Sequence, residues 1–181
     1  MELYSKETQY LQWLTNGQWF KHEIMALGRD GTPLVFGTWG EEPEFIIGLD
    51  IDAYKGVYIT LNEGTANPKR MTDSSCTLRT NLVLDFDSLK AAGHKDDPAT
   101  DIEHELAIMQ AQTCKEWLDK KLDSEAAVLD SGNGAALIYP IKWANGYEQA
   151  AAIQELYKDV KKVKTSLDLS TFNAARVYRV P

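Results

Sequence analysis

The strongest constraint on the fold is segment 82–87, LVLDFD, an apolar run that ends in two aspartates separated by one residue. Alternate side chains of an extended strand share a face, so Asp85 and Asp87 point the same way while Leu84 and Phe86 point to the other side. Two carboxylates about 7 Å apart on one face repel each other unless a cation lies between them, and a hard divalent ion is the usual one. The segment therefore predicts a buried strand ending at a candidate metal site. The alternative is a solvated carboxylate pair of an acidic protein.

The composition is that of a globular chain of 181 residues, 44% of them hydrophobic, with a formal net charge of −8. It contains no run of about 18 apolar residues and begins with a segment too polar for a signal peptide, so we expect a cytoplasmic protein without membrane contact. The negative charge argues against a phosphate-backbone binder of the basic-patch kind. It is compatible with an enzyme that handles polyphosphates through metal ions, because such an enzyme carries clustered carboxylates.

The pattern of apolar residues and turns predicts an α+β fold. The aromatic and aliphatic residues from Tyr10 to Leu14 have helical spacing. In Trp19–Ile24 apolar and polar residues alternate, which predicts a strand. The turn signal Gly28–Pro33 leads into a further apolar run, which predicts a hairpin. Gly56–Asn62 is another candidate strand. We expect one domain over residues 1–181, with an N-terminal α/β lobe to about residue 75.

Two long amphipathic helices are predicted in the remainder of the chain. Thr100-Asp-Ile-Glu is a capping box, so one helix begins there and runs to about Leu122. The other spans Tyr147–Lys164. The predicted apolar stripe of the first helix is Ile102, Leu106, Met109, Thr113 and Trp117. That of the second is Ala150, Ile153, Leu156, Val160 and Val163.

A glycine-rich turn follows the first long helix. Its sequence is Ser131-Gly132-Asn133-Gly134, and an apolar strand follows directly. The backbone N–H groups of such a turn can cradle a phosphate. A plain hairpin is the alternative interpretation.

The C-terminal segment brings together Asp168, Asn173, Arg176 and Arg179 within a short, partly apolar stretch. Arginine suits phosphate because its planar guanidinium can bond to two oxygens at once. A surface strand with solvated arginines is the alternative.

These three segments together resemble the archaeo-eukaryotic primase superfamily, most closely the primase-polymerase domains of phage and plasmid replication proteins. That family has an Asp-hydrophobic-Asp strand, then a Ser-Gly-x-Gly-x-His turn and strand, then an aspartate followed by Phe-Asn-x-x-Arg. Here the corresponding residues occur in the same order as Asp85-Phe86-Asp87, Ser131-Gly132-Asn133-Gly134, and Asp168 with Phe172-Asn173-Ala174-Ala175-Arg176. The similarity extends from about residue 18 to the end of the chain.

The resemblance implies an RRM-like antiparallel sheet with helices over about residues 76–181, packed on the N-terminal lobe. It also implies template-dependent DNA synthesis by nucleotidyl transfer, with Asp85, Asp87 and Asp168 holding Mg²⁺ or Mn²⁺. The incoming nucleotide would be bound by the turn at 131–134, with position 136, Asn173 and Arg176. The implied partners are a DNA template and primer, nucleoside triphosphates and a fused or associated helicase or accessory priming domain, in a bacterial or phage-infected cell.

One position departs from the family pattern, because Ala136 stands where the family has histidine. A hydrogen bond to a charged phosphate contributes about 1.5–3 kcal/mol, so its loss would weaken nucleotide binding by about one to two powers of ten. A nucleotide- or nucleic-acid-binding module that has lost catalysis is therefore the main alternative. A metal-dependent nuclease or phosphatase is a third, which leaves the second and third motifs unexplained. Because the family's third motif usually continues beyond this point, we expect that the chain is part of a longer protein.

Overall fold

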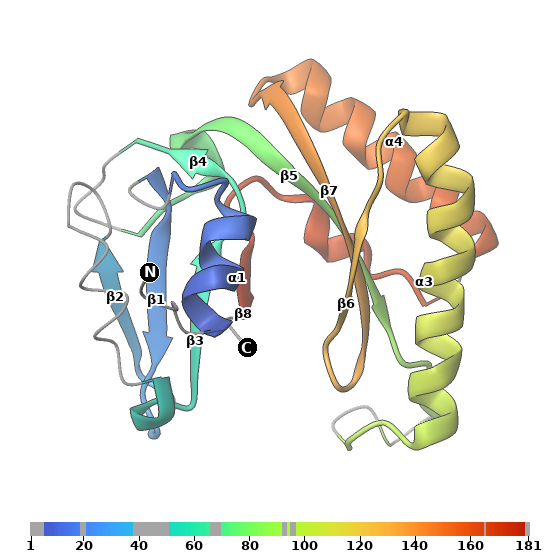
Figure 1. The fold of residues 1–181 in the computed structure, drawn as a ribbon, viewed down its shortest axis with the longest axis horizontal. Helices are drawn as coiled ribbons and strands as arrows, with labels where there is room; N and C mark the ends of the chain where they lie inside the picture. Colours follow the sequence, from blue (N-terminus) through green and yellow to red (C-terminus); the bar gives the residue numbers. More distant parts are fainter. Residues whose placement is uncertain are drawn as a thin grey trace. The chain divides into compact units, whose positions relative to one another are not determined.

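The structure is a computed structural model, and it describes residues 6–18, 21–37, 51–65, 70–91, 94, 97–164 and 166–179 (Figure 1). The chain divides into two compact units. The first comprises Met1–Thr80, Trp143–Asn145 and Ala174–Pro181, and the second comprises Asn81–Lys142 and Gly146–Asn173. That these units are the lobes of one domain stays a prediction.

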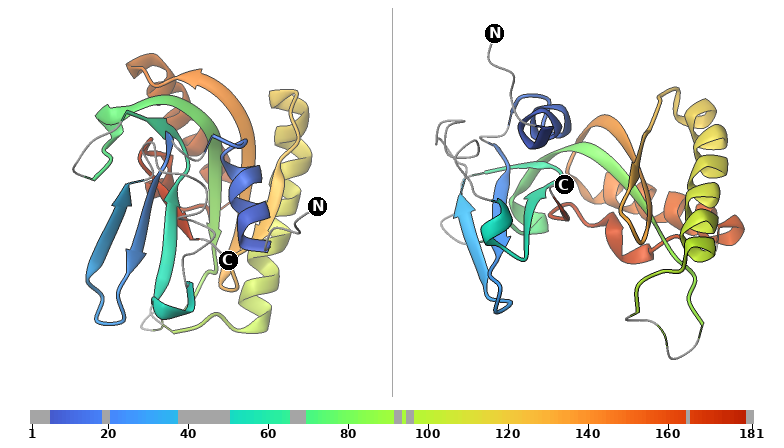
Figure 2. Two further views of the ribbon diagram at one scale, coloured as in Figure 1. Left: turned by 60° about the vertical axis from the view of Figure 1, so that its left-hand side comes forward. Right: turned by 60° about the horizontal axis from the view of Figure 1, so that its bottom comes forward.

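The first unit is built on an antiparallel sheet with the strand order β2-β1-β3-β8 (Figures 1 and 2). Its elements are α1 (Lys6–Leu14), β1 (Glu23–Leu27), β2 (Pro33–Gly37), η2 (Ile51–Ala53), β3 (Gly56–Thr60), β4 (Glu63–Gly64), η3 (Asp73–Ser75) and β8 (Val177–Arg179). The predicted hairpin is confirmed as β1 and β2, and its turn contains Gly31 at a φ of 86°. The predicted strand from Trp19 begins only at Glu23, and its residues 19 and 20 lie outside the described part of the chain.

The second unit contains the long helices and the central strands of a second sheet, of order β4-β5-β7-β6. Its further elements are β5 (Cys76–Asp87), α3 (Asp101–Leu122), β6 (Ala127–Asp130), β7 (Gly134–Ala144), α4 (Tyr147–Val163) and η4 (Leu169–Phe172), of which β5 and β7 also carry residues of the first unit. Helices α3 and α4 pack against the strands of this unit (Figure 2). The α+β fold class is confirmed.

Helix α3 begins where the sequence predicts, but it turns a different face toward the core. Thr100 and Glu103 form the reciprocal capping box. The predicted apolar stripe is wrong as a core face, since its members are exposed: Ile102, Leu106, Met109, Thr113 and Trp117. The buried residues are instead Ala107, Ala111, Cys114 and Leu118. Three of these four, Ala107, Ala111 and Cys114, are small, and small side chains let the helix backbone approach the sheet closely.

Helix α4 follows its prediction more closely. It ends at Val163, and its fully buried residues are Ile153, Tyr157 and Val160. The side chain of Val163 is 70% exposed, so the last predicted member of the stripe lies outside the core.

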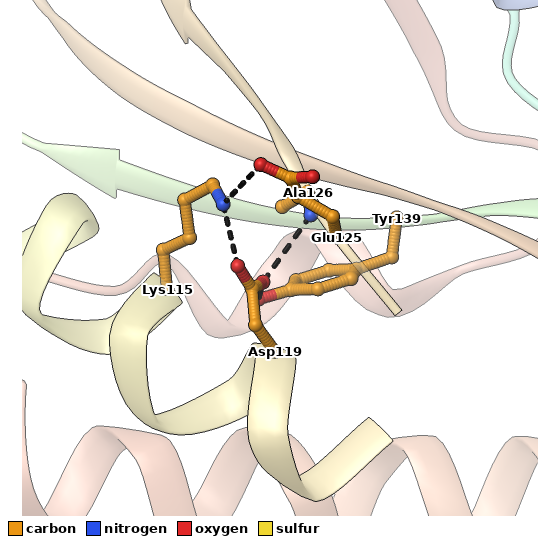
Figure 3. Close-up of polar contacts among 5 residues, drawn as sticks. All are labelled: Lys115, Asp119, Glu125, Ala126 and Tyr139. Atoms are coloured by element: carbon orange, nitrogen blue, oxygen red, sulfur yellow. Dashed lines mark hydrogen bonds and ion pairs between the residues drawn. The ribbon is translucent and has the colours of Figure 1, made fainter. Parts of the chain in front are cut away.

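A polar network fastens the C-terminal end of α3 to β7 (Figure 3). The Asp119 carboxylate accepts hydrogen bonds from the Tyr139 hydroxyl at 2.8 Å, the Ala126 N–H at 3.2 Å and the Lys115 ammonium at 2.5 Å. Burial raises the pKa of Asp119, but these three donors outweigh it and hold that pKa below its ordinary value. Lys115 also pairs with Glu125 at 3.4 Å. The end of the helix is therefore fixed on the strand that carries the second motif.

Within the described residues, the chain has no helix with the length and apolar character needed to cross a membrane.

Candidate functional site

The first motif lies at the end of β5, as the alternation of its residues predicts. Leu84 and Phe86 are completely buried on one face. On the other face Asp85 is half-buried and Asp87 is exposed. Exposure on that face therefore rises toward the end of the strand, which leaves both carboxylates at the border between core and solvent.

The third motif lies beside the first, joined to it through the backbone. The Asp168 N–H donates to the Asp85 carbonyl oxygen at 2.8 Å, and the Asp87 N–H donates to the Ser166 carbonyl oxygen at 2.9 Å. Between them, Phe86 and Leu167 form an isolated antiparallel bridge. The three aspartates, separated by about 80 residues in sequence, thus stand on adjacent stretches of backbone.

The Asp168 side chain is engaged locally at the start of η4. One carboxylate oxygen accepts from the Ser170 N–H at 2.8 Å, and the other accepts from the Ser170 hydroxyl at 2.7 Å. This is an N-cap interaction of the kind that satisfies the free N–H groups at a helix start. The carboxylate keeps further lone pairs, because an ionised carboxylate has about four acceptor positions.

The second motif packs directly on the first. A Cβ atom at Gly134 would overlap with the Phe86 carbonyl oxygen and would lie 3.4 Å from the Cα atom of Asp87. The Ser88 hydroxyl, immediately after the first motif, donates to the Asn133 carbonyl oxygen. Glycine at 134 is therefore required by the close approach of two strands, and this approach joins the glycine-rich turn to the carboxylate strand.

The glycine-rich turn is also held by residues outside the three motifs. The Asp130 carboxylate accepts from the Gly132 N–H at 2.7 Å and from His104 Nε2 of α3 at 2.8 Å. The hydrogen bond from the Gly132 backbone, and to a smaller extent the one from His104, hold the pKa of Asp130 below its ordinary value. The Asn133 side-chain oxygen accepts from the Ala99 N–H at 2.8 Å, just before α3.

Ser88 and His104 are contacts that the sequence did not reveal. Ser88 directly follows the first motif, so its position was a usable signal. No sequence signal pointed to His104, because it lies within a helix far along the chain from the turn. Only the packing of α3 brings it to Asp130.

Two N–H groups of the turn are already engaged within it. The Ser131 N–H donates to the Gly134 carbonyl oxygen at 3.1 Å, and the Gly132 N–H donates to Asp130. Gly132 has a φ of 76°, where glycine is favoured. A phosphate at this turn would therefore meet the exposed Ser131 hydroxyl rather than these two N–H groups.

Position 136, where the family has histidine, is completely buried. Ala136 is 0% exposed and pairs with Leu129 of β6. An imidazole here would overpack the site, and such insertions cost about 1–3 kcal/mol. As the structure stands, the residue at 136 has no exposed surface that could contact a nucleotide.

The two remaining candidate residues fall in different units. Asn173 follows η4 in the second unit. Arg176 belongs to the first unit, where its carbonyl oxygen accepts from the Leu61 N–H at 2.9 Å, next to the start of β8. The roles of both residues stay predictions.

The donor set suits a hard divalent ion, because Asp85, Asp87 and Asp168 offer only carboxylate oxygens. Across the described ranges, no three His, Cys, Asp or Glu side chains are gathered closely enough to hold a metal ion. The first and third motifs are thus brought together through their backbones, and a metal site formed by the three carboxylates stays a prediction.

Comparison with solved structures identifies the fold of the chain. The AEP domain of the cyanophage S-2L primase-polymerase (PrimPol) is similar to this chain with a TM-score of 0.58 and 10% sequence identity, over 96% of this chain and 80% of that one. The chain has a primase-polymerase fold. No protein-family model matches the sequence, and no curated protein is significantly similar to it.

Proposed function

We propose that the chain is a template-dependent DNA primase-polymerase that joins nucleoside triphosphates to a primer 3′ hydroxyl with Mg²⁺ or Mn²⁺. The observation that carries this proposal is the backbone contact among the three motifs in the second unit. Asp168 is hydrogen-bonded to Asp85, and Gly134 packs on Phe86. The primase-polymerase fold supports the proposal, since its evidence is independent of the motifs.

The proposed division of roles follows from where each group lies. Asp85, Asp87 and Asp168 would hold the divalent ion, which when bound stabilises the charge that develops on the phosphoryl oxygens during in-line displacement. The exposed Ser131 hydroxyl would donate to a phosphate oxygen. The contacts of Ser88 with Asn133 and of His104 with Asp130 hold the turn in place.

The substrates in this proposal are a primed DNA template and nucleoside triphosphates. A helicase or an accessory priming domain, fused or associated, is the further partner in this proposal. The setting would be the cytoplasm of a bacterial or phage-infected cell.

Primer extension with dNTPs and Mn²⁺ tests the proposal. The double variant Asp85→Asn, Asp87→Asn is expected to lose at least about 10²-fold in rate, because metal-ion stabilisation of the transferring phosphoryl group contributes several kcal/mol. Asp159→Asn is the matched control, since it removes an exposed carboxylate of α4 whose ion pair with Lys162 contributes little. An unchanged rate in the double variant, or no extension by the parent chain, would contradict the proposal.

A second candidate function is a nucleotide-binding module without catalysis. The observations that favour it are the buried Ala136 and the engagement of both Asp168 carboxylate oxygens by Ser170. It predicts that calorimetry detects binding of a dNTP with Mg²⁺ while primer extension stays at background. Extension above background would exclude this candidate, and the absence of both binding and extension would exclude both.

A further inference from the structure

Helix α3 presents a row of large apolar side chains to solvent. Ile102 is 71% exposed, Leu106 47%, Met109 54% and Trp117 44%. Their spacings of four, three and eight residues place them on one side of an α-helix. These four residues are the α3 stripe. Single exposed apolar residues are ordinary, but several large ones on one side of a helix, here interrupted by the exposed Thr113, are typical of an interaction site.

The fold has no need of the α3 stripe, because the helix is anchored by its other faces. Its core contacts are made by Ala107, Ala111, Cys114 and Leu118. Its beginning is fixed by the capping box at Thr100, and its end by the Asp119 network (Figure 3). The stripe therefore lies on a helix that is already ordered, so the helix does not have to fold when a partner binds. From first to last residue it extends about 22 Å at 1.5 Å per residue.

One flank of the α3 stripe carries acidic residues at both of its ends. Asp101, Glu105 and Glu116 are exposed and lie together along one flank. The basic residues come only at the end, where Lys121 lies 4.8 Å from the Trp117 ring centre, next to Lys120. The chain as a whole carries a formal net charge of −8. Complementary charge on a partner would thus be positive.

We propose that the α3 stripe binds a basic amphipathic helix of a partner protein. The partner helix would place apolar anchors at i, i+3, i+4 and i+7 against Leu106 and Met109, the usual mode of helix-to-helix recognition. Its lysines or arginines would pair with the acidic flank, since flanking charges decide partner choice between packed helices. This inference is independent of the proposed catalytic function.

A second copy of the chain fits the α3 stripe less well. In an antiparallel pair related by a two-fold axis, each flank meets the same flank of the other copy. Asp101, Glu105 and Glu116 would then face one another, and like charges at such positions are destabilising. Nucleic acid fits less well too, because its phosphates would be repelled by the same carboxylates.

Binding of synthetic peptides to the full chain tests the proposal. The probes are two labelled helical peptides with the same leucine stripe, one flanked by lysine and the other by glutamate, measured by fluorescence anisotropy. The lysine peptide is expected to bind at least about tenfold more tightly than the glutamate peptide. The double variant Leu106→Gln, Met109→Gln, which keeps the net charge, is expected to lose at least about tenfold in affinity for the lysine peptide.

Val163→Gln is the matched control, because Val163 is an apolar residue of α4 that is 70% exposed. It should bind the lysine peptide as the parent chain does, and circular dichroism should show that both variants keep the parent melting temperature. The proposal is overturned by equal binding of the two peptides, by no binding of either, or by equal losses in the double variant and the control. Leu106-dependent self-association in sedimentation would overturn it in favour of a second copy.

Discussion

Replacing Gly134 by alanine tests the contact that joins the glycine-rich turn to the carboxylate strand. Gly134 does not adopt a positive φ, unlike Gly17, Gly31 and Gly132. Alanine would therefore suffer no backbone strain there. Because alanine reduces the conformational entropy of the unfolded chain, the substitution would by that effect alone stabilise the protein by about 0.4–1 kcal/mol. The contact with Phe86 predicts the opposite sign.

The steric cost follows from the atoms around an added Cβ. That atom would overlap with the Phe86 carbonyl oxygen and lie 3.2 Å from the Phe86 carbonyl carbon. Both neighbours are backbone, so no flexible side chain can move aside. Strands β5 and β7 would have to separate by roughly 1.3 Å to reach ordinary non-bonded distances of about 3.5 Å. Overpacking of this kind costs about 1–3 kcal/mol. For a chain of this size that lowers the melting temperature by roughly 3–10 °C.

The assay combines thermal unfolding with primer extension below the melting transition. If the proposed function holds, a displacement of about 1 Å beside Asp87 is expected to lower the extension rate by about 10²-fold. Gly31→Ala is the control: its φ of 86° costs about 1–2 kcal/mol, but its Cβ would meet nothing within 4 Å. It should lose comparable stability and keep its extension rate. A Gly134→Ala variant as stable as the parent, or more stable, would refute the steric argument.

Three further predictions concern single side chains. Tyr139→Phe should lower the free energy of unfolding in urea by about 1–2 kcal/mol. Asp119→Ala should lower it further, because that variant leaves the buried Tyr139 hydroxyl without its hydrogen-bond acceptor. Equal losses in the two variants would contradict this order. Burial lowers the pKa of His22 below its ordinary value of 6.5. The folded state therefore favours the neutral ring, and its stability is greatest above about pH 6.5. As the pH falls below that value, the free energy of unfolding decreases by up to about 1.4 kcal/mol per pH unit. His22→Gln should reduce the dependence of urea stability on pH between 7.5 and 5.5, and an unchanged slope would count against this role. His104→Ala should raise KM for the nucleotide more than it changes kcat, because it removes a support of Asp130 at the turn, whereas His104→Asn should restore part of the affinity.

Much of the fold was predictable because it depends on short-range patterns. The alternation in segment 82–87 and the capping box at Thr100 each specify a local backbone, and both agree with the structure. The core face of α3 was not predictable in this way. Four of its large apolar side chains lie outside, because Ala107 and Ala111 on the other face let the helix approach the sheet closely.

The sequence by itself determined the order of the three motifs and the side on which Asp85 and Asp87 point, because strand geometry alone imposes that alternation. Only the tertiary structure decided that Asp168 lies beside Asp85, that Gly134 allows the turn to touch β5, and that His104 reaches Asp130. These contacts join residues far apart along the chain. They depend on the distances between packed strands and helices, which no local pattern of residues contains.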